Sequence, residues 1–470
     1  MENLGVVELR NKLLKKEISS KEIALYYLKK AEEKKDLNIF ITLNENAVKE
    51  AEDFDKKPTE SKLGGIPISI KDVFSTKDFR TTCASKILDN YVPKVESTVT
   101  KRVFENGGIN IGKVNLDQFC HGSSTINSAY GPTRHPLDKD KLPGGSSGGS
   151  AAAVIADTCA ASLGTETAGS LRQPASWCGV VGLKPTYGRV SRFGVLAMGS
   201  SLDSPGPLTK NVDDSAYLLS VIAGYDKNDF TSSKKEVPDY YKNLNPKVVE
   251  GLKIGIPKEY LEIDLEDGVR KNFQEAVRIL RKLGAQIVDV HLISPKYAIA
   301  VYTLVCRSEV SSNLSRYDGT RYCVPTKEES SFINYIESVR GKGFGNEAKR
   351  RIMTGTFALS AGYADRYYRN AEKIRQILKY DVLNTLKNEV DVIIAPSSPT
   401  TALPDDQVDN LIFGELADVL VETSSLAGLP GISIPNGFSK NLPTGLQIFS
   451  KQFEEQLVLN VAKAFENEFI

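Results

Sequence analysis

Hydrophobic and polar residues alternate in several short stretches of this sequence, a pattern typical of β-strands. In the segment 64–74, Ile66, Ile68 and Ile70 alternate with other residues up to Lys71, so the lysine points away from the isoleucine face. Further strands are expected at 109–115, 251–257, 286–292, 391–399, 431–435 and 445–449. Because these strands alternate with helices, the pattern predicts an α/β fold with a largely parallel or mixed sheet and helical cover.

Segments with one apolar face predict the helices that cover this sheet. They lie at 4–16, 19–34, 45–54, 98–105, 268–283, 414–426 and from 453 onward. Ser19 and Glu22 form a capping-box pattern at the start of the second helix. A long, mainly helical section is expected at 296–390, and strands return after it. We therefore expect a single domain over 1–470 with a helical insertion, in which 1–62 forms an N-terminal helical layer.

The segment 142–172 combines two clusters of glycine and hydroxyl residues with a run of small apolar residues between them. Glycine permits close approach of backbone to backbone or ligand, so the two clusters indicate an active site built on turns. A flexible Gly/Ser linker has a similar composition, but the apolar run at 151–156 has no polar break. A phosphate-binding loop is disfavoured because no lysine follows Gly148 and Gly149 and no GxGxxG pattern occurs.

Composition and charge exclude several classes of function. The 470 residues carry 60 basic and 59 acidic side chains, a net charge of +1 that gives no overall attraction to nucleic acid or membrane. The beginning of the chain has no signal region and no apolar run has the length of a membrane span, so we expect a cytoplasmic protein without membrane contact. The six cysteines form no CxxC pair, which indicates reduced thiols and no metal site.

Serine and lysine are the candidate catalytic residues. Ser146, Ser147 and Ser170 lie in the glycine-rich turns, and a serine nucleophile needs a base that removes its proton. The three histidines lack an evident catalytic setting, and no GxSxG elbow surrounds the serines. A buried lysine can serve as the base because burial disfavours the ammonium form. Lys71, at the end of an apolar strand, is therefore the candidate, with a surface lysine at a strand end as the alternative.

The motifs GGSSGGSAAAV at 144–154 and GTETAGSLRQPASWCGVVGLKPTYGRVSRFG at 164–194 resemble the signature of the amidase signature family. The resemblance implies the α/β fold of that family, a large mixed central sheet covered by helices on both faces, with 63–220 as its catalytic core. It also implies a catalytic set of Lys71, Ser146 in a cis peptide bond, and the nucleophile Ser170. Four backbone N–H groups would then form the oxyanion hole, those of Thr167, Ala168, Gly169 and Ser170.

Within that family the chain is most similar to the glutamine-hydrolysing A subunits of aminoacyl-tRNA amidotransferases, through the segments 311–322, 343–363 and 426–435. This resemblance implies that Tyr302, Arg351 and Asp418 bind glutamine, with Arg350 as the less favoured neighbour of Arg351. It places the glutamine pocket partly in the section 296–390. It further implies a heterotrimer with subunits B and C, in which misacylated tRNA binds mainly to the B subunit. ATP and magnesium would be used by that partner, and this subunit would need no cofactor.

Five residues depart from the pattern of these A subunits. Glu166 and Ala168 occupy positions that usually hold Asp and Gly, respectively. His121, Gln118 and Ile126 occupy positions that usually hold Met, Glu and Glu. The last three precede the first glycine-rich turn, and two of them replace carboxylates. These replacements argue against an acidic relay for ammonia at this place, but they do not affect the expectation of hydrolysis. A free-standing amidase and a catalytically silent scaffold for an RNA-binding assembly remain the alternatives.

Overall fold

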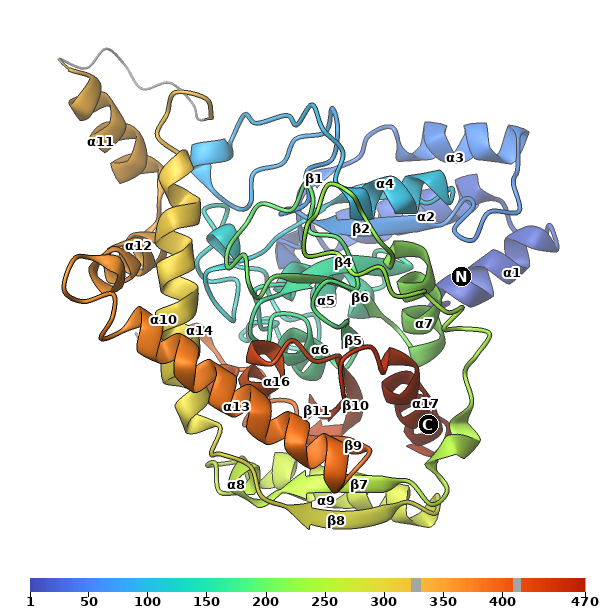
Figure 1. Ribbon diagram of the computed structural model, residues 1–470. Coiled ribbons are helices and arrows are strands. Elements are labelled where there is room, and N and C mark those ends of the chain that lie inside the picture. The colour runs from blue at the N-terminus through green and yellow to red at the C-terminus, as the bar shows by residue number, and fades with distance from the viewer. Residues whose placement is uncertain (323–330, 409–415, 470) are drawn as a thin grey trace.

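The computed structural model describes residues 1–322, 331–408 and 416–469 (Figure 1). Within these residues eleven strands form one sheet, in the order β1-β3-β2-β4-β6-β5-β10-β11-β9-β7-β8. The strands are β1 (Phe40–Leu43), β2 (Pro67–Lys71), β3 (Ile109–Val114), β4 (Ala161–Glu166), β5 (Val181–Lys184), β6 (Ser204–Thr209), β7 (Lys253–Pro257), β8 (Gln286–Val290), β9 (Val392–Pro396), β10 (Gly431–Ser439) and β11 (Leu442–Phe449). β2 runs parallel to β3 and β4, whereas β4 is antiparallel to β6, so the prediction of a mixed sheet is confirmed.

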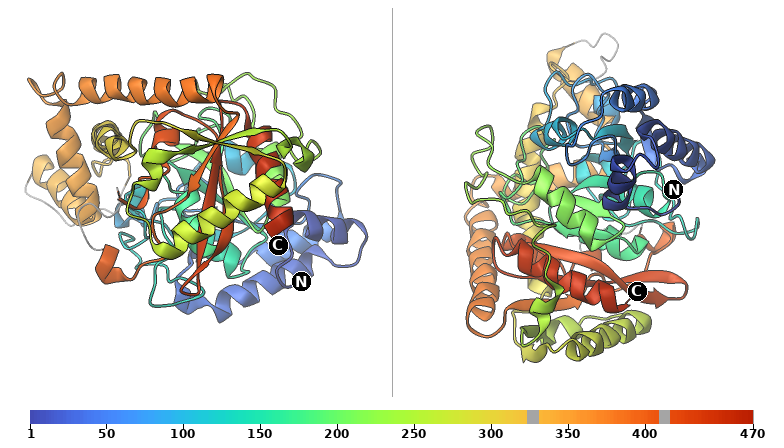
Figure 2. Two further views of the ribbon diagram at one scale, coloured as in Figure 1. Left: turned by 90° about the horizontal axis from the view of Figure 1, so that it is seen from below. Right: turned by 90° about the vertical axis from the view of Figure 1, so that its right-hand side faces the viewer.

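Helices cover both faces of the sheet (Figure 2). They are α1 (Val6–Leu14), α2 (Ser20–Glu33), α3 (Ala47–Lys56), α4 (Thr98–Glu105), α5 (Gly148–Ile155), α6 (Arg172–Cys178), α7 (Val212–Ile222), α8 (Lys258–Leu261), α9 (Asp267–Lys282), α10 (Lys296–Asn313), α11 (Phe332–Gly343), α12 (Asn346–Leu359), α13 (Tyr368–Asn388), α14 (Asp405–Val408), α16 (Glu422–Leu426) and α17 (Glu455–Phe469). α5 and α6 pack on β4 and β5, respectively, whereas α7 and α17 pack on the sheet through β6 and β10. Among the described residues, no helix is both long and apolar enough to cross a membrane.

The helices α10 to α13 form a layer at one side of the sheet, at the left of Figure 1. α10 packs against α12 and α13, and α13 packs against α16. The chain enters this layer after β8 and returns in β9, which lies between β11 and β7. Strands that precede and follow the helical layer therefore belong to the same sheet.

Complete burial of β2 explains how a lysine reaches the interior. All five residues from Pro67 to Lys71 are buried, because helices cover the sheet on both faces. The isoleucines pack into the apolar core, while Ser69 and Lys71 are buried on the opposite face among polar groups. The alternation that predicted this strand therefore reflects two buried faces, one apolar and one polar. Neither face is exposed to solvent.

The N-terminal segment differs from the sequence-based expectation. The N-terminal segment 1–62 is not wholly helical, because β1 forms the edge of the sheet by antiparallel pairing with β3. The run of small residues between the two glycine-rich turns folds as α5 followed by β4. Of the helix expected at 414–426, residues 414 and 415 lie outside the described residues, and α16 covers Glu422–Leu426. The capping box of Ser19 and Glu22 is present as predicted.

Candidate active site

The end of β2 meets the first glycine-rich turn inside the protein. Lys71 Nζ lies 2.8 Å from Ser146 Oγ and 2.9 Å from Ser147 Oγ. All three side chains are fully buried, and the peptide bond Gly145–Ser146 is cis. The structure thus brings the predicted base and the first predicted serine into direct hydrogen-bond contact.

The remaining contacts of Lys71 are also with uncharged oxygens. Its Nζ lies 3.0 Å from Thr165 Oγ1 and 3.4 Å from the Thr165 carbonyl. The carboxylate that follows it in sequence, Asp72, forms an ion pair with Lys113 at 3.3 Å and accepts a hydrogen bond from Thr82 N at 2.8 Å. In the described part of the chain, Lys71 therefore has no carboxylate partner, although it is completely buried.

The second glycine-rich turn joins β4 to α6 and carries Ser170. Ser147 N donates to the Ser170 carbonyl at 3.3 Å, which connects the two turns directly. The N–H groups of residues 167–170 donate to no other described residue, although Thr167, Ala168 and Ser170 are at most 6% exposed. Buried N–H groups are nearly always paired in folded proteins, so these four are suited to receive an oxygen of a bound molecule.

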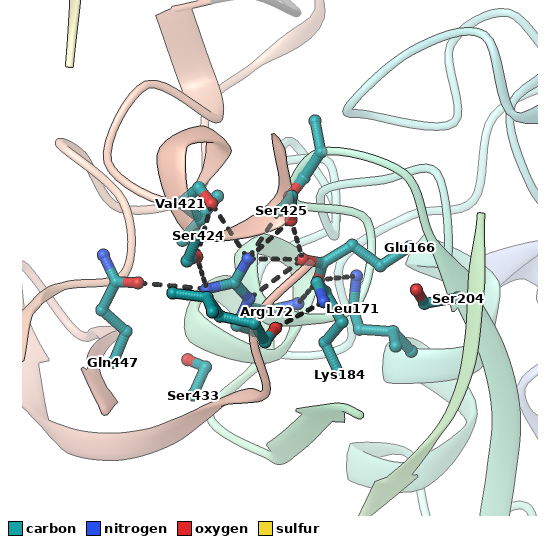
Figure 3. A network of polar contacts seen from close by, with 12 residues as sticks. Glu166, Leu171, Arg172, Lys184, Ser204, Val421, Ser424, Ser425, Ser433 and Gln447 are labelled. Atoms are coloured by element: carbon teal, nitrogen blue, oxygen red, sulfur yellow. Dashed lines mark hydrogen bonds and ion pairs between the residues drawn. The ribbon is translucent and has the colours of Figure 1, made fainter. Parts of the chain in front are cut away.

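A buried ion pair holds this turn in place (Figure 3). The Glu166 carboxylate accepts hydrogen bonds from Leu171 N at 3.0 Å and Arg172 N at 3.1 Å, immediately after the turn. It also pairs with the Arg172 guanidinium at 2.6 Å, and both side chains are completely buried. Arg172 in turn donates to the carbonyls of Ala168 and Val421. Glu166 thus occupies the N–H groups beyond Ser170 and leaves those of the turn itself available.

Asp203 supports the turn from a third side. Thr167 Oγ1 donates to Asp203 Oδ1 at 2.8 Å, and Met198 N and Gly199 N donate to the same carboxyl group. Burial raises the pKa of Asp203 to about 7. Neither Asp203 nor Arg172 was predicted from the sequence, because no local pattern marks a buried carboxyl or guanidinium group that supports a turn.

The predicted glutamine-binding residues come from the helical layer and from the segment before α16. Arg351, on α12, is 5% exposed, and its Nε donates to Glu347 at 2.6 Å. Its terminal nitrogens make no hydrogen bond to another described residue, so they remain able to grip a carboxylate. Arg350 is more exposed and is held by both oxygens of Glu347. Tyr302, on α10, is buried near Arg351, and burial raises its pKa well above the ordinary value.

Asp418 lies directly against the second glycine-rich turn. A Cβ atom at Gly169 would lie 2.3 Å from Asp418 Oδ1, so only glycine fits at this position of the turn. Asp418 also accepts a hydrogen bond from Ser123 Oγ at 2.9 Å and is among the charges that face Tyr302. Asp418 therefore lies beside the turn that carries Ser170 and close to Tyr302 of α10.

Two of the departures from the A-subunit pattern have structural roles. Gln118 Nε2 donates to Ser85 Oγ at 2.8 Å and to the Gly343 carbonyl at 3.1 Å, and its Oε1 accepts from Gly345 N at 2.7 Å. It thereby attaches the start of α12 to the core. Ile126 packs beside the buried cluster that contains Leu142 and Trp177. Neither residue supplies a charge near the glycine-rich turns.

The described residues contain no group of three or more histidine, cysteine, aspartate or glutamate side chains arranged to hold a metal ion. His135 is buried, with Nε2 2.9 Å from the Trp177 carbonyl, and His291 is exposed beside Glu259. Cys83, Cys120, Cys159, Cys178 and Cys306 are free and buried, and Cys323 lies outside the described residues.

The comparison with protein families agrees with this geometry, because the family description "Amidase" matches residues 22–459. The chain belongs to the amidase family. It is 46% identical to the A subunit of glutamyl-tRNA(Gln) amidotransferase from Thermoanaerobacter pseudethanolicus, over 99% of this chain and 96% of that protein.

Two solved structures of this family show the same fold. The crystal structure of the A subunit of glutamyl-tRNA(Gln) amidotransferase from Thermotoga maritima is 41% identical and has a TM-score of 0.81, covering 95% of this chain and 91% of that chain. The native peptide amidase of Stenotrophomonas maltophilia is 27% identical and has a TM-score of 0.85, covering 99% of this chain and 96% of that chain. The fold of the amidase signature family, expected from the motifs, is therefore confirmed.

Proposed function

We propose that this chain is the glutamine-hydrolysing A subunit of a tRNA-dependent amidotransferase. The observation that carries the proposal is the 46% identity over 99% of the chain to a protein named as such a subunit. The contact between Lys71 and Ser146 supports amide hydrolysis by the same set of residues. Its ammonia would serve the ATP-dependent conversion of Glu-tRNA(Gln) to Gln-tRNA(Gln), of Asp-tRNA(Asn) to Asn-tRNA(Asn), or of both.

In this mechanism Ser170 Oγ attacks the side-chain amide carbon of glutamine. Its proton passes through the Ser146 hydroxyl to Lys71 Nζ, which supports the relay by its 2.8 Å contact with Ser146. The carbonyl oxygen becomes an oxyanion held by the N–H groups of residues 167–170. When the carbon–nitrogen bond breaks, the proton returns by the same path to ammonia. Water then hydrolyses the glutamyl ester and restores Ser170.

Binding of free glutamine requires a cation for its carboxylate and an anion for its ammonium group. Arg351 would grip the carboxylate with its terminal nitrogens, and Asp418 would accept from the ammonium group beside Gly169, with Tyr302 between them. The assignment comes from the resemblance, and the position of Asp418 beside Gly169 in the Ser170 turn supports it.

The proposal includes two partners, the subunits B and C, and a cytoplasmic location where tRNA is aminoacylated. The B subunit would bind the misacylated tRNA and use ATP and magnesium, while the present chain would work without a cofactor. The name of the Thermoanaerobacter pseudethanolicus relative, which describes one subunit of an amidotransferase, supports the expectation of partners.

The test uses the full chain co-purified with the subunits with which it associates in its native cell. A glutamine-mimicking electrophile should label Ser170 in the wild type and not in Ser170→Ala. The complex should then amidate Glu-tRNA(Gln) or Asp-tRNA(Asn) with glutamine as nitrogen donor. Absence of labelling, with equal behaviour of the wild type and Ser170→Ala, would contradict the proposal and leave a silent scaffold.

A free-standing amidase is the second candidate, supported by the likeness to the Stenotrophomonas maltophilia peptide amidase. The two candidates differ in their preferred substrate. A preference for glutamine over simple amides supports the glutamine-hydrolysing role, whereas faster hydrolysis of simple or peptide amides by the isolated chain supports the free-standing amidase.

A further inference from the structure

His121 is one of the three departures from the A-subunit pattern that precede the first glycine-rich turn. Its side chain is completely buried. Neither ring nitrogen, Nδ1 or Nε2, has a hydrogen-bond partner among the described residues. An imidazole buried without a partner is uncommon, because the water lost from its polar atoms is normally replaced. A partner for this ring is therefore to be sought in a molecule that the protein binds.

The neighbours of the ring indicate where that molecule lies. The two charges that act on His121 are the guanidinium groups of Arg351 and Arg307. Gln118 fixes the His121 segment to Gly343 and Gly345, immediately before α12, which carries Arg351. The Phe119 ring lies 6.4 Å from the His121 ring and 5.7 Å from that of Phe344, in the same junction. The segment of His121 is thus attached to the junction before α12, and Arg351 of α12 and Arg307 of α10 are near enough for their charges to act on its ring.

The chemistry of the ring defines what it can bind. Burial lowers the pKa of His121 well below its ordinary value, and the positive charges of the two arginines lower it further. The ring is therefore neutral near pH 7. A neutral imidazole offers one N–H donor and one acceptor nitrogen. Beside cationic guanidinium groups, a ligand oxygen with negative charge is favoured over an ammonium group.

We propose that His121 is a substrate-binding residue that donates an N–H to the α-carboxylate of the bound amino acid, beside Arg351. This inference rests on the proposed function and adds a specificity residue to it. The resemblance implies methionine at this position, which has no N–H donor, so the contact would be a property of this chain. Glutamine would gain affinity from it, whereas an amide without an α-carboxylate would not.

The test compares two substrates in two variants. Glutamine carries the α-carboxylate, and 4-aminobutanamide is the same molecule with hydrogen in its place. In His121→Met the KM for glutamine should rise about 10- to 100-fold, the size of one hydrogen bond to a charged group, with kcat changed less than threefold. The kcat/KM for 4-aminobutanamide should change less than twofold. His121→Gln, which keeps an N–H donor, should recover most of the affinity for glutamine.

A second measurement covers the case in which 4-aminobutanamide reacts too slowly. Glutamine binding is then measured by calorimetry in the Ser170→Ala background, where His121→Met should raise Kd about 10- to 100-fold. The exposed His291 provides the matched control, because His291→Met should leave every constant unchanged.

Equal losses for both substrates in His121→Met, or no loss for either, would overturn the inference. Both results leave the proposed function intact, provided that the wild type hydrolyses glutamine through Ser170. A wild type that does not hydrolyse glutamine would instead contradict the proposed function, and with it the inference.

Discussion

Replacing Glu166 by glutamine tests whether the buried ion pair holds the turn of Ser170. The Glu166 carboxylate receives Leu171 N, Arg172 N and the Arg172 guanidinium, which occupy both of its oxygens. A carboxamide has only one oxygen. If that oxygen keeps the guanidinium, the amide NH₂ faces the two backbone N–H groups, and both lose their acceptor.

The stability cost follows from the burial of the pair. Removing one charge of a fully buried ion pair costs about 3–5 kcal/mol, because the other charge remains unpaired in the interior. Whole domains are stable by about 5–15 kcal/mol, so the Glu166→Gln protein should still fold. Displacement of one oxyanion-hole donor by the loosened turn should lower kcat for glutamine by about 10²–10³.

Urea unfolding and steady-state hydrolysis of glutamine measure these two effects. Glu166→Asp, which introduces the residue usual in A subunits, keeps the charge and should lose less stability and less activity than Glu166→Gln. Glu468 provides a control, because it pairs with Lys282 at 2.9 Å on the surface, and Glu468→Gln should cost less than about 1 kcal/mol. A Glu166→Gln protein with a loss below about 1 kcal/mol and an unchanged kcat would refute this reasoning.

Three further predictions concern other parts of the site. Ser146→Ala should lower kcat for glutamine by about 10²–10⁴ with little change in KM, while Ser147→Ala should lower it much less; equal losses in the two would argue against a relay through Ser146. Gln118→Ala removes three neutral hydrogen bonds, so it should cost about 2–4 kcal/mol in urea unfolding and raise KM for glutamine; an unchanged KM would show that α12 is positioned without it. Burial lowers the pKa of Lys184 to about 7, below that of the unfolded chain, so the native protein binds fewer protons above pH 7. The wild type should therefore gain stability relative to Lys184→Met as pH rises from 7 to 10, by up to about 1.4 kcal/mol per unit, and a pH-independent difference would refute this.

The elements that sequence predicted best are those with a clear period. The helix expected at 98–105 is α4 (Thr98–Glu105), and the strand expected at 109–115 is β3 (Ile109–Val114). The α5 and β4 segments have no period, because almost every position there is small and buried. β6 contains Pro205 and Pro207, which normally indicate an edge strand, yet it lies between β4 and β5.

The residues of the site likewise include some that local sequence patterns marked and others that no local pattern marked. Lys71 became a candidate because it ends an apolar strand, and Ser146, Ser147 and Ser170 because they lie in glycine-rich turns. The choice of Lys71, Ser146 and Ser170 as the catalytic set came from resemblance and stays a prediction. No pattern marked Arg172, since Ser424 and Gln447, which bind its guanidinium together with Glu166, come from segments more than 250 residues away. The roles of Tyr302, Arg351 and Asp418 came from resemblance alone and stay predictions, although the structure buries all three.

The proposed role of Lys71 as a base depends on the carboxylates around it. Asp72 is adjacent in sequence but is paired with Lys113, and Glu166 is paired with Arg172. Asp72 is thus neutralised by Lys113 and Glu166 by Arg172, whereas the buried carboxyl group of Asp117, which also interacts with the charge of Lys71, accepts hydrogen bonds from the N–H groups of Ser124 and Thr125. Lys71 Nζ itself contacts hydroxyl and carbonyl oxygens. A carboxylate in contact with Lys71 would keep its amine in the ammonium form before the reaction, and an ammonium group cannot accept the proton from Ser146. Lys113 and Arg172, which contact no part of the proposed relay, thus contribute to it by holding the carboxylates of Asp72 and Glu166 away from the base.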